Sequence, residues 1–95
     1  MINFPKWVQG KKSDAASAIA ARRLRYLVLR ASVELTCKGS VTSLGQFAGV
    51  ENGTMHWSIH NGCFSIASAK KLEEACGRDL VRKEWLIYPL DIASE

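Results

Sequence analysis

The segment 15–36 constrains this 95-residue chain most, because it contains neither glycine nor proline and is rich in alanine, leucine and arginine. These residue types have high helix propensities, and Ser13 or Asp14 can cap the amino end of a helix there. Gly39 and Ser40 would end it. The segment therefore predicts one long helix, around which an all-α chain can be organised.

Apolar residues within this segment recur at helical spacing and form two stripes. The first stripe is expected to face the core and comprises Ala20, Leu24, Leu27, Val28, Ala31 and Leu35. The second stripe lies on a different face and comprises Tyr26, Leu29 and Val33. One packing partner needs only one stripe, so we expect the second to contact another subunit.

Short helices separated by glycines are expected after residue 40. The first covers 44–48, with Thr42 or Ser43 as its cap, and it ends at Gly49. The second covers 53–60 and ends at a favoured stop signal, Asn61-Gly62.

The last third of the chain predicts two more helical segments. Ser65 would cap a helix that closes at Gly77. Residues 82–86 fit one further helical turn, and an edge strand over 85–88 is the alternative. We therefore expect about five helices in total.

The length of the chain bounds its organisation to one domain of ordinary size and excludes large enzymes with separate substrate and cofactor domains. Residues 1–12 contain Pro5 and Gly10 and show no helical period, so we expect an arm there and a single domain over 13–95. Nothing in the sequence suggests a nucleophile with a base, an orienting carboxylate and an oxyanion cradle. We expect neither an enzyme nor a cofactor.

Positive charge is concentrated in the first part of the chain. Residues 1–40 carry eight Lys or Arg against two acidic residues, whereas residues 41–95 carry five against seven. Such a basic region on a domain of net charge +4 favours a polyanionic partner, either a phosphate backbone or an anionic membrane surface.

The sequence shows neither a long apolar span nor the basic leader and apolar stretch of a secretory signal, so we expect a cytoplasmic protein that does not enter a membrane. Its three cysteines show no CxxC spacing, which suits a reducing compartment. We expect Cys37, Cys63 and Cys76 all to be buried as small apolar residues.

Residues 44–62 resemble a helix-turn-helix of the Cro and CI repressor type. Two short helices that cross steeply need a small residue at their contact, which Gly45 supplies, and Gly49 supplies the tight turn. The apolar anchors of the motif are Leu44, Ala48, Val50 and Met55. The sequence departs from the pattern at Gly53, which weakens the second helix, and at Ser58, where a bulky apolar residue is usual. Trp57 or Ile59 would fill that gap.

The resemblance extends downstream and covers roughly residues 40–90. Segments 65–77 and 81–86, with Pro89, are similar to the closing helix, glycine and short basic turn of YdaS-like prophage regulators. Arg82 occupies a position where that family usually has Ser or Thr, so the last turn lacks its cap. The resemblance implies a lambda-repressor-like all-α domain and a prophage or bacterial transcription regulator of Cro type, located at the nucleoid.

In such a domain the second helix of the motif enters the major groove of DNA. By their position in the motif, the base-reading residues would be Glu51, Asn52, Thr54, His56, Trp57 and His60. Contacts to the DNA backbone are expected from basic residues of the first part of the chain and from polar residues near the first motif helix. These are Lys11, Lys12, Arg22, Arg23, Arg25, Thr42, Ser43 and Gln46.

A single unit of this size reads only a few base pairs, so we expect a homodimer or higher oligomer on a double-stranded operator. The apolar tail 80–92 and the second stripe are the candidate assembly surfaces. One alternative is the antitoxin of a toxin–antitoxin pair, with a toxin as partner. Another is a protein-binding adaptor that does not bind DNA, for which Glu51 and the acidic second part of the chain count.

A zinc site is the remaining chemical alternative. His56 and His60 are four residues apart with Cys63 nearby, which would place three ligands at one helix end. A fourth ligand is missing, so we expect no metal.

Overall fold

The computed structural model describes residues 2, 4–9 and 15–92. The regular elements of these ranges are all helices, which confirms the predicted all-α class. They are α1 (Lys6–Gln9), α2 (Ala16–Thr36), α3 (Val41–Ala48), α4 (Asn52–Asn61), α5 (Ile66–Cys76), α6 (Lys83–Ile87) and a 3-10 helix, η1 (Pro89–Asp91). None of the helices in these ranges combines the length and apolar character needed to cross a membrane.

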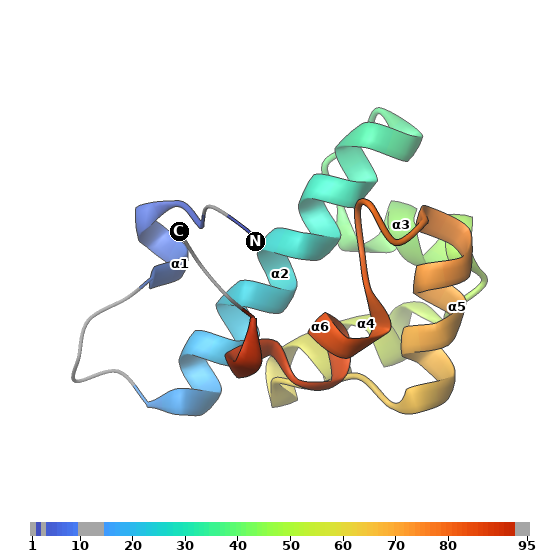
Figure 1. Ribbon diagram of the computed structural model, residues 1–95. Coiled ribbons are helices and arrows are strands. Elements are labelled where there is room, and N and C mark those ends of the chain that lie inside the picture. The colour runs from blue at the N-terminus through green and yellow to red at the C-terminus, as the bar shows by residue number, and fades with distance from the viewer. Residues whose placement is uncertain (1, 3, 10–14, 93–95) are drawn as a thin grey trace.

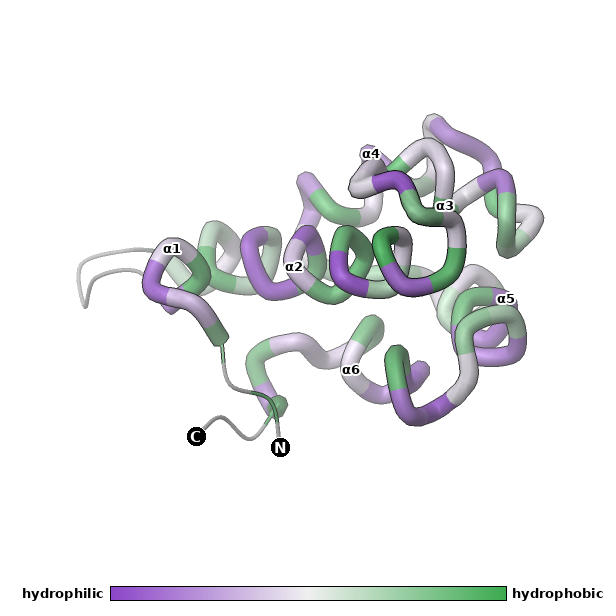
Figure 2. Tube along the Cα trace, turned by 90° about the horizontal axis from the view of Figure 1, so that it is seen from above, coloured by the Kyte–Doolittle hydropathy of each residue, from purple (hydrophilic) through white to green (hydrophobic). Residues whose placement is uncertain are grey.

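The long helix α2 is the axis of the fold (Figure 1). Seen from above, α3 and α4 lie along one side of α2, whereas α6 lies on the other (Figure 2). The α5 helix packs against α3 and α6 beyond these two layers, and α1 contacts α2. Every helix therefore packs directly on α2 or on an element that does.

The first apolar stripe of α2 faces the core as predicted. Ala20, Leu24, Leu27, Val28 and Ala31 are buried, and Leu35 is partly buried. The helix ends at Thr36, the last residue of the predicted stretch, but its C-cap is Cys37 in a left-handed conformation (φ 59°) and not Gly39 or Ser40. At the other end Ala15 is the N-cap residue and makes no capping side-chain bond, while the expected caps Ser13 and Asp14 lie outside the described residues.

The second stripe of α2 is used mainly within the subunit, which corrects the expectation that it faces another copy. Tyr26 is covered by two aromatic rings in edge-on contacts, Phe4 at 5.7 Å and Trp7 at 6.2 Å between centroids. Leu29 packs against the main core, and only Val33 is largely exposed. The extra apolar surface of α2 thus holds the amino-terminal residues of the same chain.

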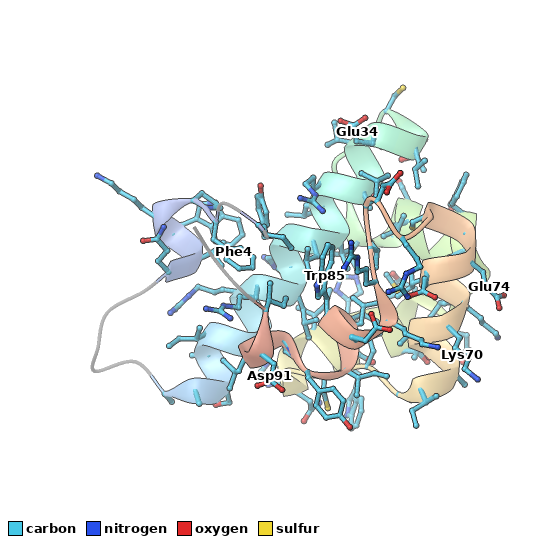
Figure 3. The ribbon with its side chains drawn as sticks, in the orientation of Figure 1. Phe4, Glu34, Lys70, Glu74, Trp85 and Asp91 are labelled. Carbon is cyan, nitrogen blue, oxygen red and sulfur yellow. The ribbon has the colours of Figure 1, made fainter. Side chains whose placement is uncertain are left out.

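The helix α1 and the burial of its neighbours were not expected from the sequence. Ile2, Phe4 and Val8 are buried in a second core cluster with Leu27 and Ile92. Pro5 starts the helix, since its carbonyl accepts hydrogen bonds from the amides of residues 8 and 9, and proline is well tolerated in a first helical turn. Phe4 lies between α1 and α2, and Trp85 points from α6 toward α2 (Figure 3).

The α3 helix begins three residues earlier than predicted. Its N-cap is Ser40, whose Oγ accepts a hydrogen bond from the amide of Ser43, so neither Thr42 nor Ser43 is the cap. The predicted cap of α5 is confirmed, because Ser65 Oγ accepts from the amide of Ser68. Helices α3, α4 and α5 end at glycines 49, 62 and 77 as expected.

The α6 segment is helical, which decides against the strand alternative. Arg82 at its N-cap position makes no side-chain capping bond. A carboxylate from α5 takes this role, because Glu73 Oε2 accepts a hydrogen bond of 2.8 Å from the amide of Lys83. The loop before α5 is tied to α6 by a bond from the Phe64 amide to the Leu86 carbonyl.

The prediction that all three cysteines are buried is wrong. Cys37 and Cys63 are exposed, and Cys76 is partly buried. Cys37 lies where α2 ends at the surface, and Cys63 follows directly on the end of α4. Both residues lie at or just after exposed helix ends. The type of a residue does not indicate such a location.

Candidate functional site

The α3–α4 pair forms the framework of the candidate site. The two helices are joined by the short segment 49–51, and the Val50 amide donates a hydrogen bond of 2.9 Å to the Gly45 carbonyl. Gly45 is buried against the side chain of Met55. The predicted contact between the two helices at a small residue is confirmed.

The orientation of α4 about its own axis decides which side chains reach solvent. Met55, Ser58 and Ile59 are buried, so Ile59 provides the apolar contact next to Ser58. Trp57 has 66% of its surface exposed. The structure therefore resolves the choice between Trp57 and Ile59 in favour of Ile59.

The predicted base-reading residues lie on the outer side of α4 and at its start. Thr54 is partly buried, and the other members of the set are exposed: Glu51, Asn52, His56, Trp57 and His60. The predicted set thus lies on α4 and on the residue before it, and five of its six members are exposed.

An open groove of about 570 Å³ runs between α2 and one edge of α4. Its walls come from three elements. Its lining comprises Trp7 of α1, Ala21, Arg22 and Arg25 of α2, and His56, Ile59 and His60 of α4. We call this the basic groove, because two arginines and two histidines line it and none of the acidic residues that the structure describes does.

A second groove, of about 490 Å³, borders the opposite edge of α4. The residues that line it are Glu51, Gly53, Thr54, Trp57, Ser58 and Ser65. Five of the predicted base-reading residues are therefore divided between the grooves, with both histidines at one and Glu51, Thr54 and Trp57 at the other.

Polar groups of α3 and of the segment before it form the third part of the site. Thr42 is exposed, and its hydroxyl donates a hydrogen bond of 2.8 Å to Asn52 Oδ1, which joins α3 to α4. Ser43 and Gln46 line a shallow hollow of about 330 Å³ with Lys38. One member of the set predicted to contact the DNA backbone, Thr42, is thus hydrogen-bonded to Asn52 of the base-reading set.

Arg23 is separated from the other arginines by its contacts. Its Nη1 donates to the Pro89 carbonyl at 2.9 Å, and its guanidinium carbon lies 5.0 Å from the ring centroid of Phe4. Arg23 therefore ties η1 and the amino-terminal residues to α2, and it does not line the basic groove. Lys11 and Lys12 lie outside the described residues.

Two residues of the site were missed by sequence reasoning. Lys38 stands next to Ser43 and Gln46, and its signal was its charge just before α3. Trp7 lines the basic groove although it is far in sequence from α4, and no local pattern indicates that contact.

A metal centre is not formed by the described residues, because no three His, Cys, Asp or Glu side chains among them are grouped so that they could hold an ion. Comparison with protein-family models, curated proteins and solved structures gives no match.

Proposed function

We propose that this chain is a sequence-specific DNA-binding transcription regulator in which α3 and α4 act as a lambda-repressor-like helix-turn-helix. The observation that supports this is the exposed side of α4, which carries polar and aromatic side chains and is bordered by the arginines of the basic groove. The Cro-like and YdaS-like affiliation, with a prophage or bacterial origin, is part of the same proposal.

Recognition of bases is assigned to α4, because the major groove is wide enough to admit one helix. The Asn52 amide suits adenine, and the Glu51 carboxylate suits the amino group of cytosine. Trp57 offers a large apolar surface, which suits contact with a thymine methyl group. These groups are exposed at the start and on the outer side of the helix.

Contacts to the DNA backbone are assigned to two regions. Arg22 and Arg25 line the groove at one edge of α4. Lys38, Ser43 and Gln46 line one hollow beside α3. Phosphate contacts fix the position of a protein on the duplex, and base contacts then give the specificity.

The proposal includes pairing of two copies on an operator with two half-sites, because one such unit reads only a few base pairs. Tyr88 and Leu90 are exposed apolar residues of the tail. They border a hollow of about 280 Å³ lined also by Gly62, Ile87 and Pro89. Analytical ultracentrifugation of the wild type and of Tyr88→Glu tests this surface, with a loss of dimer expected for the variant.

The first experiment is selection of binding sequences from a pool of random duplexes, followed by fluorescence anisotropy on the selected duplex and on an unrelated one. A specific regulator enriches a defined sequence and binds it about a thousandfold more tightly than unrelated DNA. A pool that enriches no sequence, with no measurable duplex binding, contradicts the proposal and favours a protein-binding role.

A matched pair of charge reversals tests the assigned surface. Arg25 on α2 and Lys70 on α5 are both exposed, and only Arg25 lines the basic groove. Arg25→Glu is expected to weaken binding to both duplexes and to reduce the salt dependence of log K by about one unit of slope. Lys70→Glu should leave both quantities nearly unchanged. Equal effects of the two variants would contradict the placement of DNA on this face.

A further inference from the structure

We infer that the basic groove seats phosphate groups of one DNA strand and that protonation of His56 and His60 strengthens this contact. The inference rests on the proposed function. It specifies the side of α4 along which the DNA backbone runs, and it predicts that DNA affinity depends on pH.

The lining of the basic groove supports an anionic occupant. Arg22 and Arg25 form the α2 wall, while His56 and His60, one helical turn apart, form the α4 wall. Ala21 and Ile59 contribute apolar surface, and Trp7 closes one side. The groove is open to solvent.

The distribution of charge around α4 separates this groove from its neighbour. Glu51 is the acidic residue at the start of α4, and it lines the second groove. From α2 the charged groups that face the histidines are Arg22 and Arg25, and from α1 the facing residue is Trp7. None of the acidic residues within 2, 4–9 and 15–92 lines the basic groove, so this part of the chain places no carboxylate there beside an imidazolium.

Both histidines of the chain line this one groove. Imidazole is the side chain whose ordinary charge change falls between about pH 5 and 8. A phosphate in the groove favours the protonated imidazoles, because their ring N–H groups then donate charge-assisted hydrogen bonds to it. DNA binding therefore takes up protons, and by linkage affinity falls as the pH rises through this range.

The inference changes the assignment of the α4 residues. His56 and His60 move from base reading to the phosphate contact. Base reading is left to the side chains at the start of α4 and at the second groove, Glu51, Asn52, Thr54 and Trp57.

The test measures DNA affinity by fluorescence anisotropy between about pH 6 and 8 at fixed ionic strength, on the selected duplex and on an unrelated duplex. For the wild type we expect affinity to fall roughly tenfold over this range on both duplexes, because phosphates are common to both. We also expect the salt slope to be steeper by about one to two units at the lower pH. The double variant His56→Gln, His60→Gln should show neither change.

Circular dichroism and a thermal melt establish that the exposed substitutions leave the fold intact, and the single variants divide the effect between the two histidines. Affinity that is independent of pH overturns the inference, while duplex binding itself leaves the proposed function standing. A pH effect confined to the selected duplex assigns the histidines to base reading and also overturns it. Absence of any duplex binding rejects the proposed function together with the inference.

Discussion

Gly45 and Met55 touch across the contact of α3 and α4 without space for another carbon atom. A Cβ at position 45 would stand 2.9 Å from Met55 Cγ and 3.0 Å from the Val50 carbonyl oxygen. The second of these neighbours is backbone, which cannot rotate away as a side chain does. The placement of α4 relative to α3 therefore depends on a residue without a side chain.

Gly45→Ala is expected to lower the free energy of unfolding by about 1–3 kcal/mol, the usual cost of overpacking a core. Gly53→Ala is the matched control, since a Cβ there meets nothing within 4 Å. That change should raise stability by up to about 1 kcal/mol, because alanine favours the helix. Urea unfolding followed by circular dichroism measures both values, and equal effects of the two substitutions would contradict the close contact.

Glu73 is expected to stabilise the carboxyl-terminal part of the fold through two partners. Its Oε2 accepts from the amide of Lys83 at 2.8 Å and from Arg78 Nη1 at 2.7 Å. Glu73→Ala should lower the free energy of unfolding by about 1–2 kcal/mol, as for loss of a helix cap. Glu74→Ala removes the neighbouring exposed carboxylate and should change stability by less than about 0.5 kcal/mol. Chemical denaturation measures the free energy of unfolding of both variants. A similar decrease for the two would refute the capping role of Glu73.

Cys76 is expected to make stability depend on alkaline pH. Burial raises the pKa of its thiol from 9.0 to about 11, so the folded chain keeps the proton at pH values where the unfolded chain has lost it. The contribution is complete below about pH 9 and is lost as the pH rises through 11. The melting temperature of the wild type should therefore fall relative to that of Cys76→Ala as the pH rises over this interval. Thermal melts of both proteins at several pH values measure the difference.

The three thiols should also react differently with a thiol reagent. Cys37 and Cys63 are exposed, whereas Cys76 is partly buried and keeps its proton to higher pH. Two thiols are expected to react rapidly in the folded protein at neutral pH and the third only on unfolding, because the thiolate is the reactive form. Rapid reaction of all three in the folded state would show that Cys76 is not protected.

The hydroxyl of Thr42 is expected to support recognition by α4, if the proposed function is correct. It donates to Asn52 Oδ1 at 2.8 Å. This bond orients the side-chain amide of Asn52 and does not use its NH₂ group. Thr42→Val keeps the shape and removes the donor, so affinity for the selected duplex should fall about fivefold, the worth of one hydrogen bond. Thr42→Ser retains the donor and should bind nearly as the wild type does. Equal losses on selected and unrelated duplexes would show that Thr42 acts on the backbone instead.

The secondary structure was largely predictable, since it follows from local patterns. The spacing of Leu24, Leu27, Val28 and Ala31 repeats with the period of a helix, and these residues are buried on one side of α2. Ser65 is a good N-cap because of its own side chain, and it caps α5. The amino-terminal residues were harder, because Ile2 and Val8 are buried only through contacts with α2 and the distant Ile92.

The arginines of α2 show where sequence reasoning about the site reaches its limit. Arg23 and Arg25 are two residues apart and have the same chemistry. Arg23 binds the carbonyl of Pro89, whereas Arg25 is exposed and lines the basic groove. Two positions along a helix differ by more than half a turn, so neighbours of equal charge meet different surroundings. Only the packed structure distinguishes them.

From the sequence alone came the all-α class, the long central helix and the glycine at the contact of α3 and α4, because helix propensity, capping and residue size act within a few residues of the chain. Tertiary structure decided which side chains share the basic groove. Trp7, Arg25 and His60 meet there from three separate helices. Their meeting depends on how α1, α2 and α4 pack around the core, and no local pattern of residues encodes that arrangement.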